Sequence, residues 1–362
     1  MVIEMKKINS LQGLRAIAFL AIFISHARLK NFGALGAWGV SVFFVLSGFL
    51  MIYNYLPKQI ITKSAICFSW SKIKKLYPLH IFMMLSVAIP LLMKVFSGEE
   101  SLKKWTIDIL LHAFLIQIWV PNSEYYATLN GPSWFLSACV FLYFCFPTIL
   151  KRFRNQKNNN VYIAMVWFVL GQLAFSGIAF LFGNRESAVF TMQWITYYFP
   201  LARLMDFLIG CCLGYLFLNK EECEQNDFLK NSVQEIILLI LIAISFLIYW
   251  KRYSILGQEY LRYTVLFTLT TIPLIWLVAC GKGLFSKVIE KPFWVRIGNI
   301  SAYTFLIHEV VIRYCTAIMN KLIDNPNEYI IATISLVMTF VAAKVWKELQ
   351  QTVVRCKQKA SM

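Results

Sequence analysis

Charged residues are scarce in this chain, and carboxylates are scarcer than cations. Only 15% of the 362 residues are Asp, Glu, Lys or Arg, whereas a soluble domain carries about 25%. The sequence therefore lacks the polar surface of a soluble protein. The net charge of +17 comes from 35 Lys and Arg against 18 Asp and Glu. We expect these cations in the loops of a membrane protein, not at a nucleic-acid interface.

Metal-ligand spacings and repeats are also missing. The nine cysteines form no CxxC pair, so we expect no metal site and interpret them as small buried apolar residues. Low-complexity sequence is confined to 157–160, and no internal repeat is visible. These absences predict one membrane domain over residues 1–346, followed by a short basic cytoplasmic tail over 347–362.

Hydrophobic residues, in contrast, make up 59% of the chain and gather into runs of near-spanning length. We predict an all-α polytopic membrane protein with about ten spanning helices. The expected spans are 11–27, 38–56, 77–96, 133–150, 161–182, 195–218, 233–250, 263–281, 298–320 and 329–346. The further run 105–120 is short and carries Asp108 and His112, so we predict that it does not cross.

The distribution of basic residues assigns the orientation. If the N-terminus is cytoplasmic and 105–120 does not cross, the cytoplasmic loops hold 21 Lys and Arg and the outer loops nine. Basic loops face the cytoplasm. We therefore predict cytoplasmic termini and a re-entrant or interfacial segment at 105–120.

Two polar residues, Arg15 and His26, lie on the first apolar helix. Eleven residues are about three turns, so both side chains project from one face, about 16 Å apart along the axis. Within a membrane such residues usually mark a functional path. Each alone is equally explained as an interfacial residue, Arg15 as a snorkelling anchor and His26 as a carbonyl-bonded imidazole. Their shared face favours function.

Further polar motifs each allow two interpretations. Lys72 and Lys75 either anchor a cytoplasmic loop or bind phosphates as point charges. The segment with Glu124, Ser133 and Trp134 is either a sugar-binding surface or an interfacial aromatic belt.

The later spans also carry polar groups. Arg203 and Asp206, three residues apart, can pair on a helix surface, and we slightly prefer a structural role for them. His308 is a candidate catalytic residue, although a hydrogen-bonded packing role is the stronger interpretation. The small residues around Ser47 and Gly48 predict close helix packing.

In this order the motifs resemble the acyltransferase family 3 membrane enzymes. The matching blocks are Arg15-x10-His26, Phe43-Phe44-x-x-Ser47-Gly48-Phe49, Lys72-x-x-Lys75-x-Tyr77-Pro78, Ser133-Trp134-x-Leu136-Ser137 through Phe146-Pro147, Arg203-x-x-Asp206-Phe207-x-x-Gly210 and Ser301-x-Tyr303-x-x-Leu306-Ile307-His308. They cover essentially the whole chain. Lysines stand where the family commonly has arginines, and Cys139 stands where it often has a glutamate. The role of that acid must be absent, moved or unnecessary here.

The resemblance implies transfer of an acyl group, commonly acetyl, from cytoplasmic acyl-CoA to a hydroxyl of a cell-envelope or lipid-linked glycan. It places the protein in the bacterial cytoplasmic membrane. His26 would act as general base or carry the acyl group itself. Arg15 would position the donor or stabilise charge on the thioester carbonyl, and Lys72 and Lys75 would hold the CoA phosphates.

The partners follow from the same resemblance. Acetyl-CoA is the expected donor, and no metal is expected. The acceptor is a glycan or lipid-linked oligosaccharide. Membrane lipids surround the chain, and the sequence leaves open whether it forms a homo-oligomer. The acceptor-side candidates are Glu124, Ser133, Trp134, Arg203, Asp206 and His308. Many family members carry an extracytoplasmic hydrolase-like domain. We expect none in this chain, which would then complete the transfer within its membrane domain.

Two rival functions stay open on the sequence. One is a transporter or flippase for an anionic lipid-linked substrate, which would use the same cations as a pathway. Transporters often contain repeated halves, and none is visible here. The other is an inactive relative that acts as an assembly partner, which Cys139 keeps open.

Overall fold

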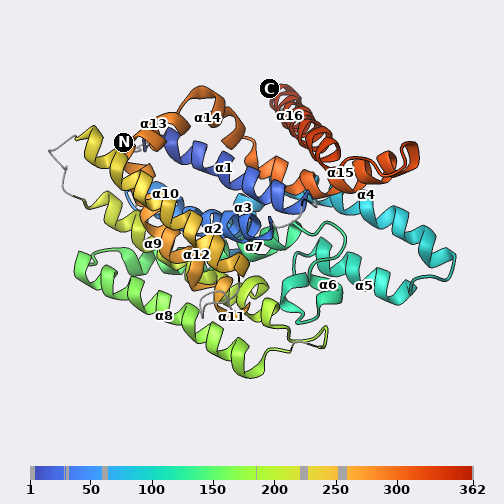
Figure 1. The fold of residues 1–362 in the computed structure, drawn as a ribbon, viewed down its shortest axis with the longest axis horizontal. Coiled ribbons are helices and arrows are strands. Elements are labelled where there is room, and N and C mark those ends of the chain that lie inside the picture. Colours follow the sequence, from blue (N-terminus) through green and yellow to red (C-terminus); the bar gives the residue numbers. More distant parts are fainter. Residues whose placement is uncertain are drawn as a thin grey trace.

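The computed structural model describes residues 5–27, 29, 32–58, 64–184, 186–220, 227–251 and 259–360. The helices in this part of the chain are α1 Asn9–His26, α2 Gly33–Tyr55, α3 Ala65–Ile73, α4 Tyr77–Phe96, α5 Leu102–Ala113, η1 Gln117–Trp119, α6 Ser123–Tyr126, α7 Ser133–Phe153, α8 Asn158–Phe182, the π-helical η2 Trp194–Tyr198, α9 Pro200–Leu218, α10 Phe228–Lys251, α11 Glu259–Arg262, α12 Val265–Cys280, α13 Leu284–Ile289, α14 Pro292–Gly298, α15 Ser301–Leu322 and α16 Glu328–Ala360. Figure 1 shows them packed as a bundle, and the described β-structure consists of two isolated bridges. The all-α prediction is confirmed.

Eight helices of the described residues are long and apolar enough to cross a membrane: α2, α4, α7, α8, η2 with α9, α10, α11 with α12, and α16. The protein is therefore a polytopic membrane protein, as predicted. The other two expected spans, 11–27 and 298–320, are also continuous helices, α1 and α15. They are not among the eight, and they are the helices that carry His26 and His308.

The apolar helix α1, which carries Arg15 and His26, lies inside the bundle. It packs against α2, α14 and α15, and its Leu14, Phe19 and Ile22 have no exposed surface. Because these neighbours shield α1, it can keep polar groups that are costly against lipid. By contrast, α8 leaves large apolar side chains uncovered, such as Phe182 with 73% of its surface exposed, as a helix facing lipid tails does.

Glycines bring α2 and α9 into backbone contact. A Cβ atom on Gly48 would lie 2.0 Å from the carbonyl oxygen of Phe207, and one on Gly210 would lie 1.9 Å from that of Val45. Any side chain at either position would push the helices apart, so the predicted close packing of small residues is confirmed. The crossing fixes α2, which supplies much of the site described below.

The run 105–120 does not form a spanning helix. Helix α5 has 12 residues and is about 18 Å long, shorter than the roughly 30 Å of hydrocarbon in a bilayer. The chain then turns at Leu115, whose φ is +56°, and enters the short η1. This segment packs along α4.

Two titratable residues of α5, Asp108 and His112, are buried in the protein. Asp108 accepts a hydrogen bond of 3.1 Å from the Thr128 hydroxyl, and burial raises its pKa to about 6. His112 has no exposed surface, and burial lowers its pKa to about 4. Both groups are therefore held in their uncharged forms over part of the acidic pH range.

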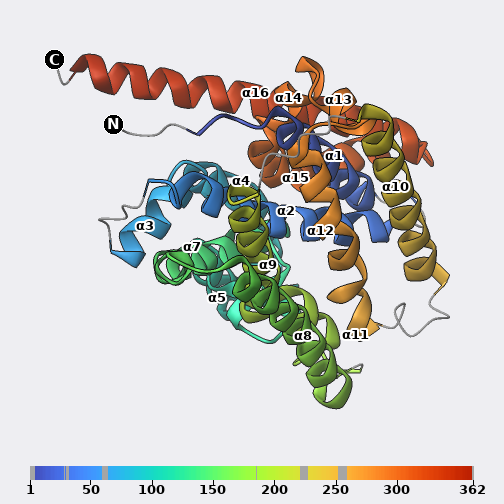
Figure 2. The ribbon, with the colours of Figure 1, turned by 90° about the vertical axis from the view of Figure 1, so that its left-hand side faces the viewer.

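The expected basic tail is not a separate segment. Helix α16 continues through it to Ala360 and extends beyond the bundle toward the C-terminus (Figure 2). Its Gln350 donates a hydrogen bond to the carbonyl oxygen of Lys75 and accepts one from the Tyr303 hydroxyl. The start of the tail thus docks on the basic loop before α4. Of the basic residues counted for orientation, some lie outside the described residues: Arg28, Lys30, Lys63, Arg185 and Arg252.

Candidate functional site

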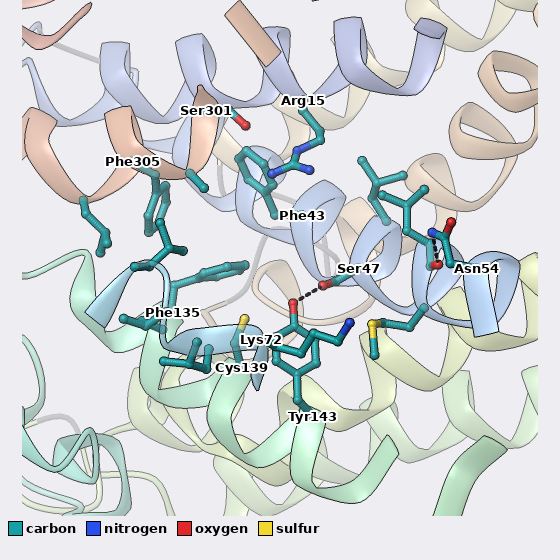
Figure 3. A pocket seen from close by; sticks show the side chains of 18 of the residues that line it. Arg15, Phe43, Ser47, Asn54, Lys72, Phe135, Cys139, Tyr143, Ser301 and Phe305 are labelled. Atoms are coloured by element: carbon teal, nitrogen blue, oxygen red, sulfur yellow. Dashed lines mark hydrogen bonds between the residues drawn. The ribbon is translucent and has the colours of Figure 1, made fainter. Parts of the chain in front are cut away.

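A cavity of about 480 Å³ lies between α1, α2, α3, α7 and α15 (Figure 3). This volume is within the range of small-molecule sites. The lining residues used below are Arg15, Phe43, Ser47, Asn54, Tyr55, Lys58, Lys72, Phe135, Cys139, Tyr143 and Phe305. In Figure 3, Phe135 and Phe305 stand on one side of the hollow, Asn54 stands on the opposite side, and Arg15 points in between them.

Cations gather along this cavity. Arg15, Lys58 and Lys72 all line it, and the described lining includes no carboxylate. The Lys72 ammonium donates a hydrogen bond to the Tyr55 hydroxyl and lies 4.3 Å from the centre of the Tyr55 ring. The buried Nε of Arg15 has no hydrogen-bond partner among the described residues. A cavity lined by uncompensated positive charge attracts an anion.

Hydroxyl and thiol groups occupy the middle of the cavity. The hydroxyls of Ser47 and Tyr143 are 3.0 Å apart and hydrogen bonded, as the dashed line in Figure 3 marks. The side chains of Cys139 and Tyr143 also hydrogen bond to each other. The position where the family often has a glutamate therefore faces this cavity, and a neutral thiol fills it.

Three phenylalanines close the end of the cavity away from Asn54. The ring centres of Phe43 and Phe135 are 6.0 Å apart, those of Phe43 and Phe305 are also 6.0 Å apart, and those of Phe135 and Phe305 are 5.1 Å apart. These mutual contacts bring α2, α7 and α15 together. The cavity thus combines a few cationic and hydroxyl groups with a mostly apolar lining, to which these three rings belong.

A pair of histidines lies beyond the phenylalanines. The ring centres of His26 and His308 are 5.0 Å apart, with the ring planes at 75°. His26 is exposed, whereas His308 is buried. His308 also lies 5.8 Å from the Phe305 ring, measured between centres. The two histidines predicted separately, 282 positions apart in the chain, therefore meet.

Hydrogen bonds assign the tautomer of both imidazoles. Nδ1 of His26 is 2.9 Å from the carbonyl oxygen of Ile22, and Nδ1 of His308 is 2.7 Å from that of Phe305. Since a carbonyl oxygen only accepts, each neutral ring carries its proton on Nδ1. Each Nε2 is then the basic nitrogen, and that of His308 is buried with no described partner.

The predicted pair Arg15 and His26 is divided between two places. Both belong to the single helix α1, but Arg15 lines the cavity and His26 does not. The same holds for the two predicted lysines. Lys72 lines the cavity, whereas Lys75 is exposed and lies 5.8 Å from the centre of the Tyr303 ring.

The acceptor-side residues Glu124, Ser133 and Trp134 do not line this cavity. Glu124 forms an ion pair of 3.4 Å with Lys104 at the surface. Ser133 is fully buried and accepts a hydrogen bond of 3.3 Å from Gln117. Trp134 packs among aromatic rings: Phe44, Phe135, Tyr197 and Tyr198.

Arg203 and Asp206 form an ion pair of 3.0 Å in which each side chain is only 1% exposed. Asp206 also accepts hydrogen bonds from Gln172 of α8 and Thr268 of α12, while Arg203 donates to the carbonyl oxygen of Thr196. The pair ties α8, α9, α12 and η2 together, and Nε of Arg203 is buried without a hydrogen-bond partner among the described residues. These contacts favour the structural role, and substrate binding by this pair stays a prediction.

Sequence reasoning missed several residues of the site. Lys58 follows Pro57 in the basic loop, so the loop charge was a signal for it. Tyr143, Phe135 and Phe305 lie on apolar helices, where aromatic residues usually indicate packing, and no signal in the sequence singled them out.

Comparison with known proteins identifies the family of this chain. A family profile described as an acyltransferase domain, that of acyltransferase family 3, matches residues 8–345. "Acyltransferase MdmB" of Streptomyces mycarofaciens is 26% identical over 235 residues, which are 58% of this chain and 57% of that protein. "Peptidoglycan O-acetyltransferase OatA" of Listeria monocytogenes is 27% identical over 222 residues, 59% of this chain and 34% of that protein.

The aligned regions thus cover 57% and 34% of these two relatives' lengths. No solved structure matches the chain significantly. The family profile extends over nearly the whole chain and includes both α1 and α15. This chain belongs to acyltransferase family 3.

Proposed function

We propose that the protein is a membrane O-acyltransferase that moves an acyl group, acetyl in the simplest case, from acyl-CoA to a hydroxyl of a cell-envelope glycan. The observation that carries the proposal is the juxtaposition of a cation-lined cavity with a pair of histidines just beyond its closed end. The cavity suits a polyanionic donor, and the histidines supply bases for the reaction.

The donor would enter with its phosphates toward Lys58 and Lys72. Lysine ammonium groups bind phosphates as point charges, and both residues line the cavity. The uncharged pantetheine arm would lie past Ser47 and Tyr143, with the thioester toward Phe43 and the histidines. The unpartnered Nε of Arg15 is available to position the donor or to stabilise charge that develops on the thioester oxygen.

His26 is proposed as the general base. Its Nε2 would take the proton of the acceptor hydroxyl while the hydroxyl oxygen attacks the thioester carbon. The C–S bond then breaks, the ester forms, and the CoA sulfur leaves with the proton that His26 took up. His308, buried against His26, would position that ring and keep its Nδ1 proton directed at the Ile22 carbonyl.

The exposure of His26 indicates where the acceptor binds. Because His26 is open at the end of α1, a bulky glycan can reach it without entering the bundle. We infer from the basic loops that the cavity's lysines face the cytoplasmic side of a bacterial cytoplasmic membrane and that His26 faces the outer side. A peptidoglycan or other envelope glycan would fit this arrangement, and one relative is named a peptidoglycan O-acetyltransferase.

Transfer of label tests the proposal. Membranes with the wild type, His26→Ala or the matched control His80→Gln would receive acetyl-labelled acetyl-CoA and the host glycan pool. His80 is a buried histidine on α4, bonded to the His112 carbonyl, a bond that a glutamine amide can keep. We expect base-labile label with the wild type and control, and none with His26→Ala.

The other outcomes are equally informative. Equal label with His26→Ala would discard His26 as the base and keep the enzyme. Absence of label and of CoA binding in the wild type would refute acyl-CoA-dependent transfer and favour the alternative function, a transporter or flippase.

A further inference from the structure

The histidine pair lies outside the lining of the cavity. Arg15, Cys139 and Tyr143 line the cavity, and neither histidine does. Phe43, Phe135 and Phe305 also line it, with every pair of ring centres within 6.0 Å, and the Phe305 ring contacts that of His308. This cluster of rings therefore stands where the cavity lining meets the histidine pair.

Phe305 belongs to both the cavity and the surroundings of the histidine pair. Its ring lines the cavity and also lies 5.8 Å from His308 between ring centres. Its carbonyl oxygen accepts the Nδ1 proton of His308. Only 6% of the surface of Phe305 is exposed, so the residue is almost completely packed between the cavity and the histidine pair. A change at Phe305 would affect both at once.

We propose that Phe305, with Phe43 and Phe135, is a gate between the donor cavity and the outward histidines. Rotation of the Phe305 ring away from Phe43 and Phe135 would admit the thioester to His26. When the gate is closed, it separates the water on the two sides of the membrane and keeps the thioester from water that enters beside His26. The identity of the donor rests on the proposed function; the gate itself rests on the ring geometry.

A native thiol reports on the gate without any need for catalysis. Cys139 lines the cavity on the donor side of the phenylalanines and is 4% exposed. A charged methanethiosulfonate that does not cross membranes, added to intact cells from the His26 side, would reach Cys139 only through an open gate. We expect Cys139 of Phe305→Ala to be modified at least tenfold faster than that of the wild type, as measured by peptide mass.

Three controls make this comparison interpretable. Phe141→Ala removes a phenylalanine of α7 that faces a different groove and should leave Cys139 protected. Cys139→Ala identifies signal from other thiols. In inside-out vesicles the reagent enters from the end of the cavity that Lys58 and Lys72 line. Cys139 should then react at similar rates in the wild type, Phe305→Ala and Phe141→Ala if the bundle is intact.

Two results would overturn the gate. One is equal modification of Cys139 from the His26 side in the wild type and Phe305→Ala, with reaction from the donor side preserved. The other is rapid modification in the wild type. If Phe305→Ala fails to fold, Phe135→Ala makes the same test, with the same two refuting results.

A kinetic measurement separates this proposal from the proposed function. With acetyl-CoA and no acceptor, we expect Phe305→Ala to raise the rate of thioester hydrolysis several-fold, whereas Phe305→Leu, which keeps most of the bulk, changes it little. An unchanged rate of hydrolysis would contradict a gate that excludes water. If the wild type neither binds nor uses acetyl-CoA, the proposed function fails, and the thiol experiment still decides the gate.

Discussion

Two neighbouring lysines should differ sharply in their effect on the donor. Lys72 lines the cavity, and Lys75 is exposed outside it. A hydrogen bond to a charged group contributes about 1.5 to 3 kcal/mol when buried. Lys72 is half-buried, so we expect about 1 to 2 kcal/mol, or roughly a 5- to 30-fold loss of affinity for Lys72→Gln. Lys75→Gln should change affinity by less than about twofold.

The assay must separate binding from folding. Lys72 also lies over the Tyr55 ring, a contact worth about 0.5 to 1 kcal/mol at an exposed site, so the ligand-free Tm is measured first. The rise in Tm with CoA then reports binding without turnover, because a ligand stabilises the state that binds it. The donor KM from acetyl transfer gives a second measure, and kcat should change little.

Equal effects of the two substitutions would refute this reasoning. They would show that the donor lies across the exposed loop and not in the cavity. A lower ligand-free Tm of Lys72→Gln with unchanged CoA binding would instead show that Lys72 only packs against Tyr55.

Three further predictions follow from the fold. Asp206→Asn should lower the free energy of unfolding in detergent by about 3 to 5 kcal/mol, because it leaves the buried charge of Arg203 uncompensated; Glu290→Gln, which breaks an exposed ion pair of the same spacing, should cost less than about 1 kcal/mol. Gly210→Val should prevent assembly of α2 against α9, because a Cβ at this position would lie 1.9 Å from the Val45 carbonyl oxygen; a normal yield of folded, monodisperse protein would contradict this packing. Burial raises the pKa of Asp108 to about 6, so folding favours its protonated form and this stability is lost as pH rises from about 4 through 6. Asp108→Asn should therefore raise the free energy of unfolding at pH 7.5 by no more than about 3 kcal/mol, seen as a higher Tm than that of the wild type, and leave it unchanged near pH 4.

Much of the fold could be predicted because long apolar runs leave a chain few alternatives. In a bilayer, backbone groups must be satisfied within each segment, so such runs become helices. The short polar run around Asp108 and His112 was correctly excluded as a span by its length. The sequence did not show that the basic tail continues α16, since polar helix and polar coil are similar in composition.

The site was predicted only in part. Arg15, Lys72 and His308 were named from their charge or chemistry; the structure places Arg15 and Lys72 in the cavity lining and His308 against His26. Lys75 was named on the same grounds, but it lies three positions further along a tight turn and is exposed. The sequence allowed a pair of Arg203 with Asp206 but not the further partners of the pair, because those come from several helices and no local pattern reveals them.

The sequence by itself determined the class of the protein. Hydropathy, loop charge and ordered motifs were sufficient for an all-α membrane protein that resembles acyltransferase family 3, because these signals are local and additive along the chain. Only the tertiary structure decided that His26 meets His308 and that Lys58 joins Lys72. It alone showed that the rings of Phe43, Phe135 and Phe305 contact one another beside the cavity. These contacts depend on which helix faces cross, and that is set by packing such as the glycine contact of α2 with α9, which acts between residues far apart in the sequence.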